Sequence, residues 1–168
     1  LGLIEQRAGE YTFTESGSAL LSGKEKFSDI FVRACLNYRI EDQIPPVWPY
    51  KIIIQVLLAT HRLTFPQFVF GPYSIKNGSD EEIAKAINNV MELSELYPNL
   101  ENLSDGNRRT VLADLNERFE TAYDLNEIWG STTVKNRFGY FKGHLSLIEG
   151  IEADTRSIRI EPSQAEKV

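Results

Sequence analysis

The polar side chains best suited to recognising a nucleic acid are concentrated in the segment 131–142. Its N-terminal half holds Ser131, Thr132, Lys135 and Asn136, and Arg137 follows directly. An Asn side chain can form two hydrogen bonds with adenine, and Lys or Arg can do so with guanine. In a helix-turn-helix the second helix enters the major groove with its N-terminal half against the base edges. The segment therefore predicts a DNA-recognition helix.

Further cations follow this segment and suit the DNA backbone better than the bases. Lys142 and His144 lie one to two turns later, where they favour phosphate contacts, while Arg156 and Arg159 are placed to reach phosphate or the minor groove. The complete predicted DNA-binding set is Thr132, Lys135, Asn136, Arg137, Lys142, His144, Arg156 and Arg159. An alternative stays open, because Lys and Arg are ordinary surface residues and the same pattern describes a solvated helix face.

No residue set in the sequence indicates catalysis. Cys35 falls on the apolar face of a predicted helix, and His61 follows a buried helix, where the helix dipole favours it. The two histidines and one cysteine do not make a Cys/His zinc site. The sequence contains no strand-borne pair of carboxylates with a following Lys, no glycine-rich phosphate loop and no nucleophile elbow. We therefore predict no catalytic residue, metal or cofactor site in this chain, and whether the parent protein is an enzyme stays open.

The charge distribution limits the kind of nucleic-acid contact. The net charge of −6 argues against a broad electrostatic grip on phosphates, which needs clustered Lys and Arg. Acidic residues concentrate at 79–128, whereas Lys135, Arg137 and Lys142 fall within eight residues. Arg108 and Arg109 form a second positive spot, for which a phosphate contact and an ion pair with the acidic loop are both open. Any DNA contact must therefore be local.

The sequence indicates a cytoplasmic fragment of a longer protein. The longest apolar stretch, residues 52–59, is too short to span a membrane, and no signal peptide precedes it. A single cysteine excludes an internal disulfide and fits a reducing compartment. The chain starts with Leu1 rather than Met, inside what looks like an incomplete unit, so we expect preceding helices in the parent.

Similar patterns at the two ends of the chain predict how the recognition helix is positioned. Residues 1–22 and 145–168 each show an apolar pair that closes a helix, a polar turn, an alternating strand and a polar start to another helix. This order is typical of the wing and closing helix of a winged-helix unit. In the first copy, Tyr11 and Phe13 are expected on one half-buried face. In the second, Leu147-Ile148 and Ile158–Ile160 are expected to pair, with residues 152–155 at the tip.

The intervening pattern is helical. Apolar spacing predicts helices after Phe27, from Tyr50 to Arg62, over 66–70 and from Ser79, and one long amphipathic helix through Val111–Tyr123. The recognition helix is expected to bury Val134, Phe138, Phe141 and Leu145 and to end at Gly143. A polar loop over 97–107 suggests a hinge. We therefore expect a mainly α fold with small β wings, divided into 1–26 (the C-terminal part of a first winged-helix unit), 27–104 (a helical region) and 105–168 (a second winged-helix unit).

Several of these segments resemble the recognition region of AlwI-like type IIS restriction endonucleases, a group that includes site-specific nicking relatives. The similar segments are Leu1-Gly-Leu-Ile-Glu, Tyr11 to Leu21, the connector 45–49, the helix from Tyr50, Leu63-Thr-Phe-Pro-Gln-Phe, Asn136-Arg-Phe-Gly-Tyr-Phe-Lys-Gly, Leu145-Ser-Leu-Ile-Glu and Ser157-Ile-Arg-Ile-Glu-Pro. Together they span roughly residues 1–97 and 130–168. The acidic net charge departs from what such a region should show.

The resemblance implies a multi-domain enzyme whose winged-helix units recognise a short asymmetric site in double-stranded DNA. A separate nuclease domain, absent from this chain, would cut at a fixed distance using a divalent metal, most simply Mg²⁺. The fragment would then be a monomer that contacts other domains of its parent. Two alternatives stay open: a winged-helix module that binds a protein, and a transcription regulator, which should be a dimer.

Overall fold

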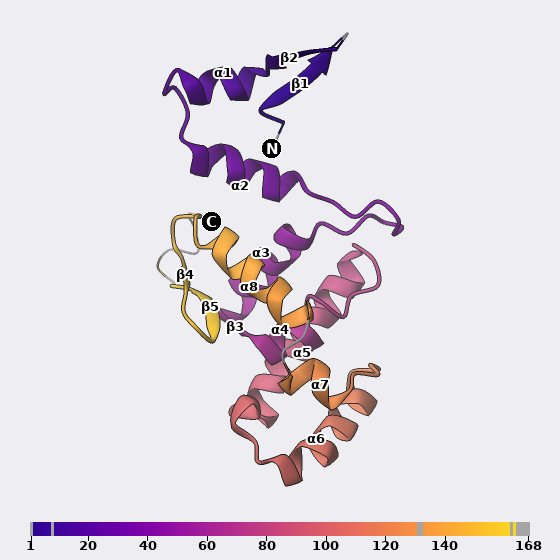
Figure 1. Ribbon diagram of the computed structural model, residues 1–168. Coiled ribbons are helices and arrows are strands. Elements are labelled where there is room, and N and C mark those ends of the chain that lie inside the picture. The colour runs from indigo at the N-terminus through magenta and orange to yellow at the C-terminus, as the bar shows by residue number, and fades with distance from the viewer. Residues whose placement is uncertain (1, 8, 131–132, 162, 164–168) are drawn as a thin grey trace. The chain divides into compact units, whose positions relative to one another are not determined.

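The computed structural model describes residues 2–7, 9–130, 133–161 and 163. The chain divides into two compact units, Leu1–Tyr38 and Arg39–Val168, here called the N-terminal and C-terminal units. Both consist mainly of helices with small antiparallel sheets (Figure 1). The predicted mainly α fold with small β elements is thus confirmed at this level.

The N-terminal unit is a β-hairpin followed by two helices. Its elements are β1 (Ile4–Arg7), β2 (Glu10–Phe13), α1 (Glu15–Leu21) and α2 (Phe27–Asn37). The two strands are antiparallel, with Ile4 opposite Phe13. Thr14 caps α1, since its hydroxyl accepts the Gly17 N–H. A Cβ at Gly17 would clash with the Leu3 carbonyl oxygen, so glycine permits the close packing of α1 on the hairpin.

Two expectations for this hairpin are wrong. The apolar pair at its start does not close a helix, because Ile4 begins strand β1. The predicted half-buried face is also exposed: Tyr11 is 74% and Phe13 55% accessible, and Ile4 opposite Phe13 is 55% accessible. Alternation shows which side chains share a face of a strand, but burial needs a further layer. Within the described part of this unit, no third strand pairs with the hairpin.

The described part of the C-terminal unit contains six α-helices, one 3₁₀ turn and three strands. In chain order they are α3 (Pro49–Thr60), β3 (Arg62–Thr64), α4 (Phe65–Phe70), α5 (Asp80–Leu96), the 3₁₀ turn η1 (Leu100–Asn102), α6 (Asp105–Arg118), α7 (Leu125–Trp129), α8 (Thr133–Leu145), β4 (Ile151–Ala153) and β5 (Ser157–Ile160). The helix start expected at Ser79 is confirmed, since its hydroxyl accepts the Glu82 N–H. Thr64 is the N-cap of α4, and its backbone N–H donates to the Gln67 side chain.

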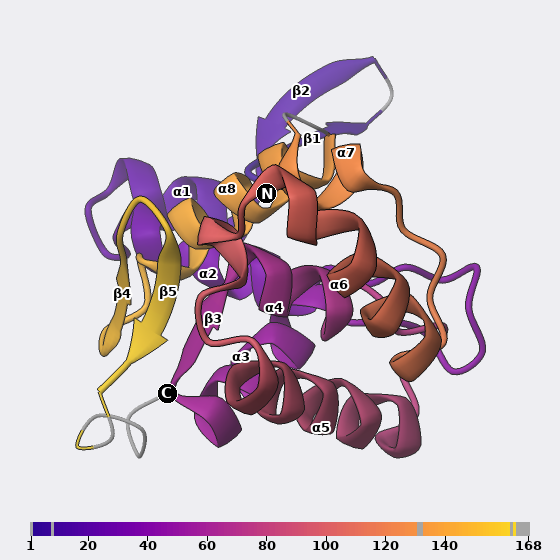
Figure 2. The ribbon, with the colours of Figure 1, turned by 90° about the horizontal axis from the view of Figure 1, so that it is seen from below.

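The core of this unit lies between α3, α4, α5 and α8. Phe68 of α4 is almost fully buried, and its ring centroid lies 5.0 Å from that of Phe138 and 5.7 Å from that of Phe141, both on α8. On the other side α5 packs against α3 and α4, as Figure 2 shows. A Cβ at Gly71 would lie 2.5 Å from Val90, so glycine allows α5 to approach the end of α4.

A three-stranded antiparallel sheet joins parts of the chain that are far apart in sequence. Its strand order is β3-β5-β4, with Leu63 opposite Ile158 and Ile151 opposite Ile160. These four side chains are each 5% accessible or less. The short strand after α3 thereby fixes the hairpin that follows α8.

The predicted long helix over 111–123 is wrong, because α6 ends at Arg118 and α7 begins at Leu125. The turn between them is held by Asn116, whose side-chain oxygen accepts hydrogen bonds from the Thr121 hydroxyl and the Tyr123 N–H. Its amide nitrogen donates to the Tyr123 carbonyl. Asp124 then caps α7 with a capping box. The apolar side chains continue at helical spacing through a turn that only these polar contacts reveal.

Three further boundaries need correction. Helix α8 does not end at Gly143 but runs to Leu145, a fully buried residue. The first wing strand is not Leu147-Ile148 but β4, because 146–150 form a turn after the helix. The predicted polar hinge at 97–107 contains η1 and the start of α6, and it is anchored by buried Leu100, whose carbonyl accepts the Trp129 indole N–H at 3.3 Å.

The limits of the two compact units differ from those of the three predicted segments. Residues 27–38 belong with the hairpin and α1, and 39–104 form one unit with 105–168. The assignment of 1–26 and 105–168 to winged-helix units stays a prediction. In the described part of the chain, no helix combines the length and apolar character needed to cross a membrane.

Candidate nucleic-acid interface

Helix α8 presents one face to the core and leaves the opposite face open. As predicted, Val134, Phe138 and Leu145 are buried, and Phe141 is half-buried against Tyr50 at 4.9 Å between ring centroids. The exposed positions include Lys135, Asn136, Arg137, Gly139, Tyr140 and Gly143. A Cβ on either glycine would meet no atom within 4 Å, so this part of the helix surface is smooth and open.

The predicted DNA-binding residues near the start of α8 have different surroundings. Thr132, like Ser131, lies outside the described residues. Lys135 is exposed, with its Nζ 5.9 Å from the centroid of the Phe65 ring. Asn136 is exposed on the same turn. Both side chains therefore lie on the solvent-exposed side of α8.

Arg137 and His144 contact aromatic residues on other helices or loops. Nη1 of Arg137 donates to the Tyr73 hydroxyl at 3.0 Å, and Arg137 stays exposed. Nδ1 of His144 lies 2.6 Å from the Tyr50 hydroxyl, and its ring also stacks against Tyr50 and Tyr140. The half-buried His144 thus helps to attach α8 to α3, a role that the sequence did not indicate.

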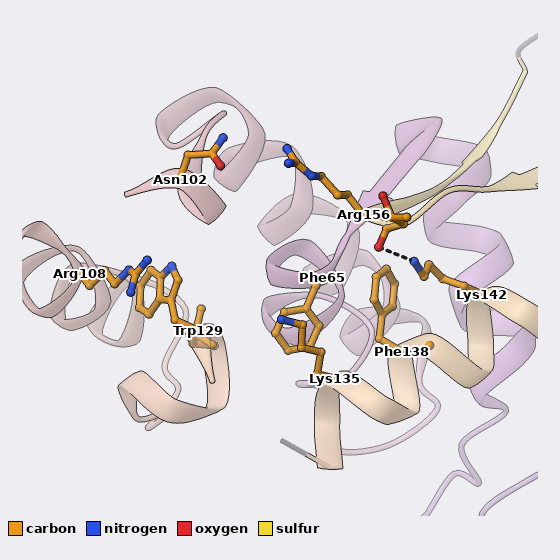
Figure 3. A pocket seen from close by; sticks show the side chains of 11 residues that line it. Phe65, Asn102, Arg108, Trp129, Lys135, Phe138, Lys142 and Arg156 are labelled. Carbon is orange, nitrogen blue, oxygen red and sulfur yellow. Dashed lines mark hydrogen bonds between the residues drawn. The ribbon is translucent and has the colours of Figure 1, made fainter. Parts of the chain in front are cut away.

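Lys142 connects α8 to the tip of the β4–β5 hairpin. Its Nζ donates to the carbonyl oxygens of Asp154 at 2.6 Å and Thr155 at 3.0 Å (the dashed line in Figure 3 marks one such contact). The sequence predicted a phosphate contact for this residue. In the structure its charge is already solvated by two backbone carbonyls, so its evident role is to position the hairpin tip.

Asp154 closes the hairpin tip from within. Its Oδ1 accepts the backbone N–H groups of Arg156 and Ser157, both at 2.7 Å, and its Oδ2 accepts the Ser157 hydroxyl at 3.0 Å. These hydrogen bonds, the two backbone ones first, lower the pKa of Asp154 from 3.8 to about 2. The ionised carboxylate therefore stabilises the loop that carries Arg156.

The two arginines of the hairpin, Arg156 and Arg159, differ in their contacts within the protein. Arg159 donates through Nε and Nη2 to Glu152 across the strand pair, at 3.0 and 2.8 Å, and Glu152 raises the pKa of its guanidinium. Arg156 is exposed at the tip, and no ion pair involving its side chain occurs among the described residues. Of the two, Arg156 is the more available for an external anion.

A pocket of about 430 Å³ lies between α8, the hairpin tip and the α6–α7 segment. Figure 3 shows Arg108 and Trp129 on one side of it, Lys135 and Phe138 on the other, and Arg156 reaching in from the hairpin. The complete lining is Phe65, Asn102, Arg108, Ile128, Trp129, Lys135, Phe138, Gly139, Lys142, Thr155 and Arg156. The sequence predicted Lys135, Lys142 and Arg156 as ligand-contacting residues, and the structure brings them together.

Sequence reasoning missed the contribution of α6 and α7 to this pocket. For Arg108 the sequence left a phosphate contact and an ion pair with the acidic loop open, and the structure shows an ion pair with Asp105 at 2.5 Å. The Arg108 guanidinium also lies 5.5 Å from the centroid of the Trp129 ring. The role of Trp129 could not be predicted from sequence, because this residue ends a short helix that carries no recognisable motif. The adjacent Arg109 faces a different depression and does not line this pocket.

The comparisons with known proteins add no assignment: no family model, curated protein or solved structure matches this chain. Among the described residues, no three His, Cys, Asp or Glu side chains gather in a way that would hold a metal ion.

Proposed function

We propose that α3, β3, α4, α8 and the β4–β5 hairpin form a winged-helix unit that binds double-stranded DNA, with α8 as recognition helix and the hairpin as wing. The observation that carries this proposal is the topology. A short strand between the first two helices pairs with the second strand of a hairpin that follows the third helix, giving the strand order β3-β5-β4. This is the connectivity that defines winged-helix domains.

One feature departs from a simple helix-turn-helix. Residues 71–132, which include α5, α6 and α7, separate α4 from α8 in sequence. The two helices nevertheless pack directly, with the Phe68 and Phe138 rings 5.0 Å apart. We treat the intervening segment as an insertion into the winged-helix unit, which explains why the helix-turn-helix is not evident from sequence spacing.

The exposed face of α8 supports a role in groove binding. Asn136 offers the side-chain amide that can form two hydrogen bonds with adenine. Each helix-interior glycine is unfavourable by about 1 kcal/mol relative to alanine, yet no packing contact among the described residues requires Gly139 or Gly143. Close approach of a DNA groove to this face supplies a reason for both.

We further propose that the chain is the DNA-recognition part of a type IIS restriction or nicking endonuclease whose metal-dependent nuclease domain lies elsewhere. This step rests on the segment resemblance alone. The exposed Ile4, Tyr11 and Phe13 favour an additional packing contact of the N-terminal hairpin, either with another domain of the parent or with a separate protein. A protein-binding module is therefore the second candidate function.

Selection from a randomised duplex library tests the DNA proposal. The expected result is enrichment of a short asymmetric motif at about 100 mM salt, since specific contacts persist where purely electrostatic binding weakens. Asn136→Ala should relax the motif at one position. Absence of any enriched motif, with weak binding that disappears as salt rises, would contradict sequence-specific recognition and favour the protein-binding module.

A further inference from the structure

The pocket between α8, the hairpin tip and the α6–α7 segment has a charge opposite to that of the chain. The sequence carries 24 acidic and 18 basic residues. The pocket lining contains four cations, Arg108, Lys135, Lys142 and Arg156, and no Asp or Glu among the described residues. They come from three separate elements, so their convergence results from the tertiary fold. Such a concentration of positive charge favours an anionic ligand.

Arg108 is held in a way that prepares it for an anion. Its guanidinium lies against the Trp129 ring, and that ring is fixed in turn by its indole hydrogen bond to Leu100. The Arg108 Nε is buried and is the one buried side-chain polar atom that lacks a hydrogen-bond partner among the described residues. Its partner Asp105 is 90% exposed at the helix start, so water screens this ion pair. An incoming oxyanion would give the guanidinium a further acceptor.

The other walls define the class of anion. Phe65 and Phe138 form an apolar floor, and Trp129 forms an apolar side wall. A pocket of about 430 Å³ with cations at its rim and aromatic rings below exceeds the size of a bare phosphate. It suits a phosphate that carries a sugar, which is the repeating unit of a nucleic-acid backbone.

We propose that this pocket binds a phosphodiester group of the DNA strand that passes between α8 and the hairpin tip, with Arg108, Lys135 and Arg156 around the phosphate and the deoxyribose against the aromatic floor. The inference deepens the proposed DNA-binding function and rests on it. Lys142 takes no direct part, because its ammonium group already binds the carbonyls of Asp154 and Thr155. The insertion between α4 and α8 thereby becomes a second DNA-contacting element.

The test compares two adjacent arginines in the full chain. Arg108→Gln and Arg109→Gln remove the same charge from the same helix, but only Arg108 lines the pocket. Binding to a fixed duplex is measured between about 50 and 200 mM salt. Arg108→Gln should lower the salt slope by about 1 and weaken binding roughly tenfold, and Arg109→Gln should do neither. Equal slopes for the two variants would overturn the inference.

Two additional measurements separate the possible failures. Because Arg108 packs on Trp129, folding of its variant is checked by circular dichroism, and Arg156→Gln at the exposed hairpin tip provides a second variant with the same expected loss of slope. Trp129 emission, recorded in a Trp48→Phe background, should change on titration with duplex and much less with Arg108→Gln. Suppose that the wild-type protein binds duplex and that a Lys135 variant binds it more weakly. If Arg108→Gln and Arg156→Gln then bind as tightly as wild-type, only this inference fails. If wild-type binds no duplex, the proposed function fails with it.

Discussion

The two hairpins of this protein have similar sequence patterns and contrasting surroundings. In the C-terminal hairpin, Ile151, Ile158 and Ile160 are each 5% accessible or less, because β3 pairs with β5 and α8 packs beside β4. In the N-terminal hairpin, Tyr11 and Phe13 are more than half exposed, and β2 pairs with β1 alone among the described residues. The comparison shows that an alternating hairpin is buried only where other elements, here β3 and α8, pack against it.

The contrast predicts very different costs for removing an apolar side chain from each hairpin. Ile158→Ala should lower the free energy of unfolding by about 2–4 kcal/mol, because it leaves a cavity among fully buried neighbours. Phe13→Ala, on the exposed hairpin, should lower it by less than about 1 kcal/mol. Urea unfolding followed by circular dichroism measures both. Similar losses would mean that the two hairpins are equally covered and would end the comparison.

A second prediction concerns α8, the helix that positions the C-terminal hairpin. Gly139→Ala and Gly143→Ala should each raise the free energy of unfolding by about 0.5–1 kcal/mol, since alanine is the better helix former and has free space at both sites. Each should nevertheless weaken binding to a duplex with the selected motif, because a methyl group obstructs close approach of the groove.

Gly106→Ala provides the matched control for this pair. It also lies in a helix where an added methyl group would meet no atom within 4 Å, but on α6 and outside the pocket. It should not weaken DNA binding. Unchanged affinity in Gly139→Ala and Gly143→Ala would place the DNA away from this face of α8.

The smallest expected effect concerns the tip of the C-terminal hairpin at low pH. The pKa of Asp154 is lowered to about 2 by the Arg156 and Ser157 hydrogen bonds. The stabilisation is therefore fully present above the ordinary pKa of 3.8 and is lost as the pH falls through about 2. Amide NMR signals of the two donors should shift over this range in wild-type and in Glu152→Gln. They should not titrate in Asp154→Asn, and a persistent titration there would assign the effect to another carboxyl group.

The sequence predicted those features that depend on residues within a single helix or strand. Thr64 and Ser79 at helix starts and the buried stripe on α8 follow from local spacing and capping chemistry. The turn after α6 was missed, because it depends on the Asn116 side chain bonding seven residues along the chain. The pairing of β3 with β5 spans about a hundred residues, and no local pattern indicates it.

Part of the candidate site could also be predicted, because some of its residues lie within a single predicted element. Lys135, Asn136 and Arg156 stand out in sequence because they lie in the predicted helix and hairpin, and the structure leaves all three exposed. Arg108 and Trp129 join Lys135 and Arg156 only through the fold. Conversely, Lys142 and His144 look available in sequence but bind groups within the protein. Tertiary contacts thus both add to the predicted site and remove residues from it.

DNA binding by α8 is tested most directly by the salt dependence of duplex binding in two charge-matched double variants. Lys135→Ala with Arg137→Ala removes two cations from α8, whereas Lys76→Ala with Lys85→Ala removes two from the loop before α5 and from α5 itself. If α8 binds DNA, the α8 pair should lower the slope of log K against log salt by about 2, and the control pair should leave it unchanged. Equal slopes for the two pairs would contradict the assignment of α8 as the DNA-binding helix.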